Sequence, residues 1–102
     1  MKFFITAYDG TDEHALDRRM SVRPDHLAGM NALMEKKQVV CAGGITSEEG
    51  KMIGSFLIMD FESREKLDEY LKNEPYVLHN VWQNIKVEHC NPVIVDNAIA
   101  GK

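Results

Sequence analysis

The sequence predicts an α+β domain with an antiparallel sheet, in which strands and helices follow the order βαββαβ. Its 102 residues are the length of one domain and are enough to bury a core without disulfide or metal support. Four short segments carry the β-branched and aromatic residues typical of strands. Between the first and second segments, and between the third and fourth, apolar residues recur at helical spacing. Two helices inserted in this way give a split βαβ arrangement.

The strands differ in how many of their faces are apolar. They are expected over residues 2–8, 38–46, 54–61 and 82–89. The first and third are apolar on both faces, so we expect them to lie together at the centre of the sheet. In the last strand, Ile85 and Val87 alternate with charged residues, which indicates one buried face. The second strand contains Gly43-Gly44, which we expect to mark a strand end or a bulge near a pocket.

The segment between the first two strands is expected to form two helices. A short helix covers residues 12–20 and is broken by Ser21 and Val22. Pro24 suits the first position of a helix, because its missing N–H would be unpaired there. We therefore expect the main helix to begin at Pro24 and to run to about Lys37.

The remaining helix and the end of the domain have clear boundary signals. Ser63 is expected to cap a helix that runs to about Asn73, where Glu74-Pro75 stops it. The last residues are small and polar, so we expect a folded domain over residues 1–95 and a loose tail over residues 96–102.

Two helices can cover only one face of a four-stranded sheet. The other face keeps large apolar side chains that need a partner. We therefore expect a homodimer with the two sheets face to face, with a higher homo-oligomer as the alternative.

The composition excludes several classes of function. The net charge of −4 argues against a nucleic-acid surface, which needs a basic stripe. No apolar run approaches the roughly 20 residues of a membrane helix. Cys41 and Cys90 lie far apart, and no pair of histidines has the spacing of metal ligands. We expect a reduced, cytoplasmic protein with no metal, no cofactor, no nucleic-acid partner and no membrane contact.

The strongest candidate for a site is the stretch from Arg18 to Leu27, which gathers three arginines and His26. If a helix begins at Pro24, His26 lies in its first turn, where the positive end of the helix favours the neutral imidazole of a general base. The free N–H groups of that turn, with Arg23 beside them, would hold an anionic group. The alternative is that Asp25 and His26 only solvate a helix start.

The same stretch carries a family resemblance. Residues 19–27, Arg-Met-Ser-Val-Arg-Pro-Asp-His-Leu, resemble the Arg-x-x-His-Leu region of YCII-like proteins. Further matches are Ala42-Gly43, Gly54-Ser55, Phe61-Glu62-Ser63 and Glu74-Pro75-Tyr76-Val77. The resemblance covers about residues 1–95 and implies a ferredoxin-like fold paired as a dimeric α+β barrel.

The resemblance also implies an active site with a histidine and an aspartate. The histidine falls on His26, whereas the aspartate of the Asp-Pro-Tyr segment is Glu74 here, a longer carboxylate. We expect the substrate to contact four further residues: Arg23, Gly43, Ser55 and Tyr76. The Gly-Pro that often follows the second strand in the family is Gly43-Gly44 in this chain, a second departure.

The activity is expected from the resemblance alone. Some YCII-like proteins are dehydrochlorinases of chlorinated hydroxyquinols, which implies a lyase or hydrolase-like enzyme for an acidic or phenolic metabolite. His26 would be the general base, Glu74 would orient it and Arg23 would polarise a substrate oxygen. Arg18 and Arg19 are expected to be solvated or at the dimer edge. Two other readings stay open: a non-catalytic dimer that binds or senses a small ligand, and a structural or regulatory dimer whose partner binds its acidic surface.

Overall fold

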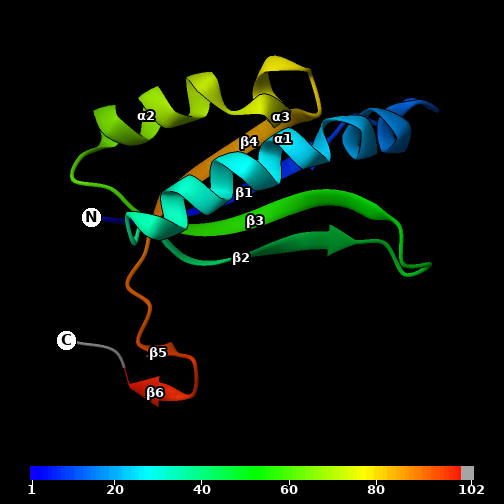
Figure 1. Ribbon diagram of the computed structural model, residues 1–102. Helices are drawn as coiled ribbons and strands as arrows, with labels where there is room; N and C mark the ends of the chain where they lie inside the picture. The colour runs from blue at the N-terminus through cyan, green and yellow to red at the C-terminus, as the bar shows by residue number, and fades with distance from the viewer. Residues whose placement is uncertain (100–102) are drawn as a thin grey trace.

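The computed structural model describes residues 1–99 of the chain. Its elements are β1 (Lys2–Asp9), α1 (Ala15–Glu35), β2 (Val39–Thr46), β3 (Met52–Asp60), α2 (Arg64–Asn73), α3 (Pro75–Leu78), β4 (Trp82–His89), β5 (Ile94–Val95) and β6 (Ala98–Ile99). The first four strands form an antiparallel sheet in the order β2-β3-β1-β4, and the three helices cover one of its faces (Figure 1). The predicted ferredoxin-like βαββαβ fold is confirmed.

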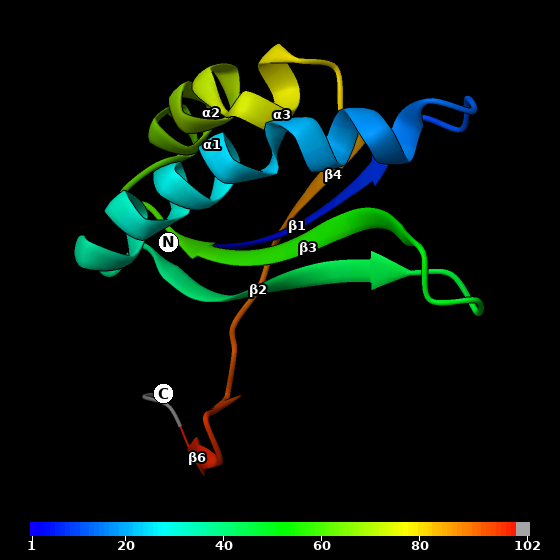
Figure 2. The same cartoon turned by 45° about the vertical axis from the view of Figure 1, so that its right-hand side comes forward.

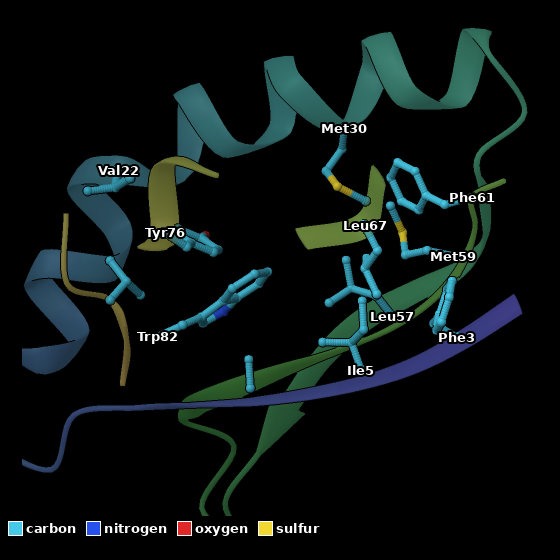
Figure 3. Close-up of a cluster of buried hydrophobic side chains, with 12 residues drawn as sticks. Phe3, Ile5, Val22, Met30, Leu57, Met59, Phe61, Leu67, Tyr76 and Trp82 are labelled. Atoms are coloured by element: carbon cyan, nitrogen blue, oxygen red, sulfur yellow. The ribbon is translucent and has the colours of Figure 1, made fainter. Parts of the chain in front are cut away.

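β1 and β3 are the central strands, as their two apolar faces predicted. Ile5 of β1 lies opposite Leu57 of β3 and opposite Val87 of β4, and residues that lie opposite one another share a face of the sheet. The face toward the helices carries the core, which consists of Phe3, Ile5, Ala7, Val22, Met30, Leu57, Met59, Phe61, Leu67, Tyr76, Val81 and Trp82. Figure 3 shows side chains from the helices meeting those of β1 and β3 in this layer.

One helix, not two, joins β1 to β2. α1 continues through Ser21, Val22 and Pro24, so the predicted break and the predicted start at Pro24 are wrong. Pro24 removes the hydrogen bond that its N–H would donate to the carbonyl of Met20. Met20 is half exposed, so water can bind that carbonyl, while the buried Val22 holds the helix against the core. The helix ends at Glu35, two residues before the predicted end.

The face of the sheet away from the helices is largely apolar along three strands. It carries Phe4, Thr6 and Tyr8 of β1, Phe56 and Ile58 of β3, and Ile45 of β2. β4 adds the charged residues Lys86 and Glu88 on the same face. Within residues 1–99 no helix covers this face (Figure 1).

Residues 91–99 leave the body of the domain after β4 and end in the hairpin of β5 and β6. In Figures 1 and 2 the hairpin lies apart from the domain, on the side of the sheet away from the helices. Ile94 and Ile99 lie opposite each other and are 70% and 83% exposed. The predicted loose tail therefore includes a strand at Ala98–Ile99, and its last residues, 100–102, lie outside the described part of the chain.

Within residues 1–99, none of the helices combines the length and the apolar character of a membrane span. Cys41 is exposed, Cys90 is half-buried, and both are free thiols.

Candidate active site

The continuous α1 places three functional side chains along one side of the helix. Arg19, Arg23 and His26 are separated by four and three residues, the spacings that bring side chains onto one helix face. Met30 follows four residues later on the same face and belongs to the core. This face lies toward β2 and β3. His26 therefore reaches the sheet from the middle of the helix and not from its N-terminus.

Glu74 meets His26 from the junction between α2 and α3. It is both the C-cap of α2 and the N-cap of α3, where its Oε1 accepts the backbone N–H of Tyr76 at 3.2 Å. The same oxygen lies 2.7 Å from Nδ1 of His26. Pro75 fixes the start of α3, and this geometry aims the Glu74 side chain at α1.

The second oxygen of Glu74 is also held. Tyr70, one turn earlier on α2, donates its O–H to Oε2. Burial raises the pKa of Tyr70, and the neighbouring Glu74 carboxylate raises it further, so Tyr70 stays a donor. Glu74 is 2% exposed, and its hydrogen-bond partners compensate the cost of burying a carboxylate.

The His26 ring is fixed by stacking as well as by Glu74. It stacks on Tyr76 with a centroid distance of 4.0 Å and an interplanar angle of 13°. The Trp82 ring packs against it in a T-shaped arrangement, with the ring centroids 5.7 Å apart and an interplanar angle of 73°. An ionised Glu74 can only accept, so Nδ1 carries the proton that points at it. In the neutral imidazole the lone pair is then on Nε2, which is the arrangement of a general base.

A cleft of 440 Å³ lies between α1 and the β2–β3 part of the sheet, and His26 is in its wall. Its wall and floor consist of Arg19, Arg23, His26, Leu27, Met30, Met34, Tyr76, the β2 segment 39–44, Met52 and the β3 segment 55–57. Apolar side chains and two arginines thus surround one imidazole. Such a cleft suits a small, partly aromatic ligand that carries negative charge.

Arg19 anchors a buried polar cluster at the floor of the cleft. Its Nη1 donates to both carboxylate oxygens of Asp9, at 2.9 and 3.0 Å, and its Nη2 donates to Ser55 Oγ at 2.8 Å. Trp82 Nε1 donates to the same Oγ at 3.1 Å. The guanidinium lies 4.9 Å from the centroid of the Tyr76 ring. Because Arg19 is 3% exposed, the prediction that it would be solvated or at a dimer edge is wrong.

The four residues expected to contact substrate all line this cleft: Arg23, Gly43, Ser55 and Tyr76. Glu74 lies behind His26 and does not line the cleft. Gly43 is in the interior of β2 and not at a strand end, and a Cβ there would lie 2.8 Å from the Phe56 ring. The expected anion site at a helix N-terminus is wrong for His26, because α1 begins eleven residues earlier, at Ala15.

Sequence reasoning missed the Asp9, Arg19, Trp82 and Tyr70 side chains. Asp9 lies just past the predicted end of the first strand, and Arg19 was placed in a short helix separate from the one that carries His26. The spacing of Arg19, Arg23 and His26 was the signal, but it becomes visible only when the helix is carried through Pro24. Arg18 instead pairs with Asp12 at 2.8 Å on the surface.

The donor set of the cleft does not resemble a metal site. In the part of the chain that the structure describes, no group of three or more His, Cys, Asp or Glu side chains could hold a metal ion. His14 and His79 are exposed at the ends of α1 and α3, and the exposed His89 packs its ring 5.0 Å from that of Phe3. His26 is therefore the histidine that the cleft contains.

The sequence is similar to that of a known protein family. The model of the YCII-related domain matches residues 1–91. Protein YciI of Escherichia coli O6:H1 is 31% identical over 94 residues, which cover 86% of this chain and 94% of the relative. Protein YciI of Shigella flexneri has the same identity and coverage.

One solved structure resembles the whole fold. It is 5-chloro-2-hydroxyhydroquinone dehydrochlorinase (TftG) from Burkholderia phenoliruptrix AC1100, in complex with 2,5-dihydroxybenzoquinone. The two structures superpose with a TM-score of 0.77 at 26% sequence identity, over 89% of this chain and 94% of the other.

Proposed function

Because the chain belongs to the YCII-related family, we propose that it is a small-molecule enzyme in which His26 and Glu74 perform acid/base chemistry on an acidic or phenolic metabolite. One observation carries the proposal: Glu74 Oε1 lies 2.7 Å from Nδ1 of a histidine that lines a cleft of 440 Å³. A buried carboxylate behind an imidazole is the arrangement that fixes the tautomer of a general base.

The roles follow from position. His26 takes a proton through Nε2, and Glu74 orients the ring and stabilises the imidazolium that forms. Arg23 is exposed at the wall of the cleft, where its charge would attract and polarise a substrate oxygen. Tyr76 fixes the His26 ring by stacking and lines the cleft.

The reaction class that we propose is an elimination of the dehydrochlorinase type. The keto tautomer of a chlorinated polyphenol carries chlorine on a saturated carbon. When His26 removes a hydroxyl proton from that tautomer, the O–H electrons form a carbonyl, the double bonds shift, and the C–Cl bond breaks. The proton goes to Nε2 and chloride leaves with the bonding electrons, so no external oxidant is needed. The similarity to a dehydrochlorinase whose structure contains a hydroxylated benzoquinone supports this choice.

The experiment that tests the proposal measures chloride release and ligand binding together. The wild-type protein is incubated with 5-chloro-2-hydroxyhydroquinone, and chloride is followed with an ion-selective electrode while 2,5-dihydroxybenzoquinone binding is measured by calorimetry. Release of chloride above the spontaneous rate supports an enzyme. Tight binding without release would favour the alternative, a non-catalytic binding or sensing protein. Neither release nor binding would overturn the proposed substrate class.

We further propose that the protein works as a homodimer in the reducing cytoplasm. The uncovered apolar face of the sheet supports a partner of the same kind, because face-to-face packing of two copies would bury Phe4, Phe56 and Ile58 from both. The hairpin of β5 and β6 extends on the side of that face (Figure 2). The free thiols of Cys41 and Cys90 fit a reducing compartment.

A further inference from the structure

The floor of the cleft holds a hydroxyl group whose hydrogen-bonding role is set by its neighbours. Ser55 Oγ lies 2.8 Å from Nη2 of Arg19 and 3.1 Å from Nε1 of Trp82. Guanidinium and indole N–H groups can only donate, so the Ser55 oxygen accepts in both hydrogen bonds. A serine hydroxyl has two lone pairs and one proton, and both lone pairs are therefore occupied. Only the O–H remains available to a further partner.

We propose that Ser55 is a dedicated hydrogen-bond donor to the ligand of the cleft, and that Asp9, Arg19 and Trp82 are positioning residues that hold it in this role. Ser55 lines the cleft, and among residues 1–99 its O–H meets no protein acceptor. A ligand must then present an acceptor, such as a carbonyl or phenolate oxygen, above Ser55. The ligand class rests on the proposed function, whereas the direction of the O–H is a property of the free protein.

The two groups that donate to Ser55 cannot easily turn away. Arg19 is held by its two hydrogen bonds to Asp9, at 2.9 and 3.0 Å, and by the Tyr76 ring beneath its guanidinium. Trp82 is 3% exposed, and its ring packs against Tyr76 in a T-shaped arrangement with the centroids 5.4 Å apart. Ser55 itself is 4% exposed. Reversal of the hydroxyl would leave a buried N–H without an acceptor, which is costly.

The cluster also has more donors than acceptors. Arg19 carries five N–H groups, and the buried acceptors that they reach are the Asp9 carboxylate and Ser55 Oγ. Arg19 Nε is the buried side-chain polar atom in residues 1–99 that has no hydrogen-bond partner. A donor-rich floor favours a ligand oxygen and disfavours a ligand N–H at the same place. Donation from the Arg19 cation also makes the Ser55 O–H a stronger donor.

The ligand-free protein gives the first test. Neutron diffraction from deuterated crystals of the full chain locates the deuteron on Ser55 Oγ. We expect it to point into the cleft, toward an ordered water, while deuterons of Arg19 and Trp82 point at Oγ. A Ser55 deuteron directed at Asp9 or at a backbone carbonyl would overturn the proposal, whether or not the protein is an enzyme.

The second test uses 2,5-dihydroxybenzoquinone as the probe. Ser55→Ala should weaken its binding roughly two- to tenfold, the worth of one hydrogen bond, and should shift the infrared carbonyl band of the bound probe to higher wavenumber. Ser55→Thr keeps the hydroxyl and should keep the band in place. Ser21→Ala is the matched control, since Ser21 is exposed and its Oγ donates to the Arg18 carbonyl.

The possible outcomes distinguish a failure of the Ser55 proposal from a failure of the proposed ligand class. An unchanged affinity and an unchanged carbonyl band in folded Ser55→Ala would overturn the proposal. Failure of the wild type to bind the probe would overturn the ligand class, and with it the proposed substrate, while the neutron result still decides the direction of the hydroxyl. Circular dichroism confirms that each variant is folded before it is compared.

Discussion

Glu74 and His26 are 48 positions apart in the chain, yet Oε1 of the one lies 2.7 Å from Nδ1 of the other. The contact is held from behind, because Tyr70 and the Tyr76 backbone N–H bind the same carboxylate. Glu74 therefore has little freedom to leave His26. A longer side chain than the aspartate of the family motif still reaches the imidazole.

Removal of the negative charge of Glu74 should reduce the turnover rate more than the thermal stability of the protein. Glu74→Gln keeps one oxygen, which can still accept the Tyr76 N–H, and places its NH2 group at Tyr70, whose oxygen can accept from it. The neutral amide cannot stabilise the imidazolium, so we expect kcat to fall roughly 10- to 100-fold. Steady-state kinetics and thermal unfolding measure the two effects. Glu69→Gln, a change at an exposed glutamate five residues earlier on α2, is the control. Equal turnover in the two variants would contradict the orienting role of Glu74.

Tyr70 should make the protein less stable in alkali. Its pKa is raised by burial, so above pH 10 the unfolded chain releases the Tyr70 proton while the folded protein keeps it. The free energy of unfolding then falls as pH rises, by about 1.4 kcal/mol per pH unit from this group. We expect a shallower fall in Tyr70→Phe, measured by urea unfolding between pH 9 and 11. Identical slopes for the two proteins would rule out this linkage.

The buried pair of Arg19 and Asp9 should matter for folding. Arg19→Met leaves the Asp9 carboxylate buried without its cation, which we expect to cost about 3–5 kcal/mol in urea unfolding. Burial already raises the pKa of Asp9, and Arg19 offsets part of that rise. The double variant Arg19→Met with Asp9→Leu should recover much of the loss. Arg18→Met breaks an exposed pair with Asp12 and should cost far less; a loss as large as that of Arg19→Met would contradict this account.

The uncovered face of the sheet should be the site of dimerisation. Ile58→Glu places a charge in the middle of this face, and we expect sedimentation velocity to show monomers where the wild type shows dimers. Leu78→Glu, a change at an equally apolar but 62% exposed residue of α3, should leave the dimer intact. A dimer that survives Ile58→Glu would place the interface elsewhere.

Most of the sheet could be predicted from local pattern, because alternation and two-sided apolar strands are properties of neighbouring residues. Ser63 was also predictable as a cap, and its Oγ does accept the backbone N–H of Lys66. Pro24 was misleading. A proline at a helix start and a proline inside a helix have the same neighbours, and only the buried Val22 and the core beneath it decide between them.

The candidate site could also be predicted from the sequence only in part. His26 was predicted from the cluster of charged residues around it and Glu74 from a motif resemblance, whereas their contact depends on how α3 packs on α1. Arg19 was expected to be solvated or at a dimer edge, whereas the continuous helix places it on the same face as His26 and buries it. Its pairing with Asp9 joins residues of a strand end and a helix that no local pattern connects.

The most direct test of the central claim is the rate of chloride release from 5-chloro-2-hydroxyhydroquinone by wild type and by His26→Ala. We expect the wild type to release chloride above the spontaneous rate, and His26→Ala to lose roughly 100-fold or more in kcat while its fold and oligomeric state stay unchanged. His79→Ala, a change at an exposed histidine outside the cleft, should keep the wild-type rate. Wild-type turnover by folded His26→Ala would contradict the assignment of His26 as the base.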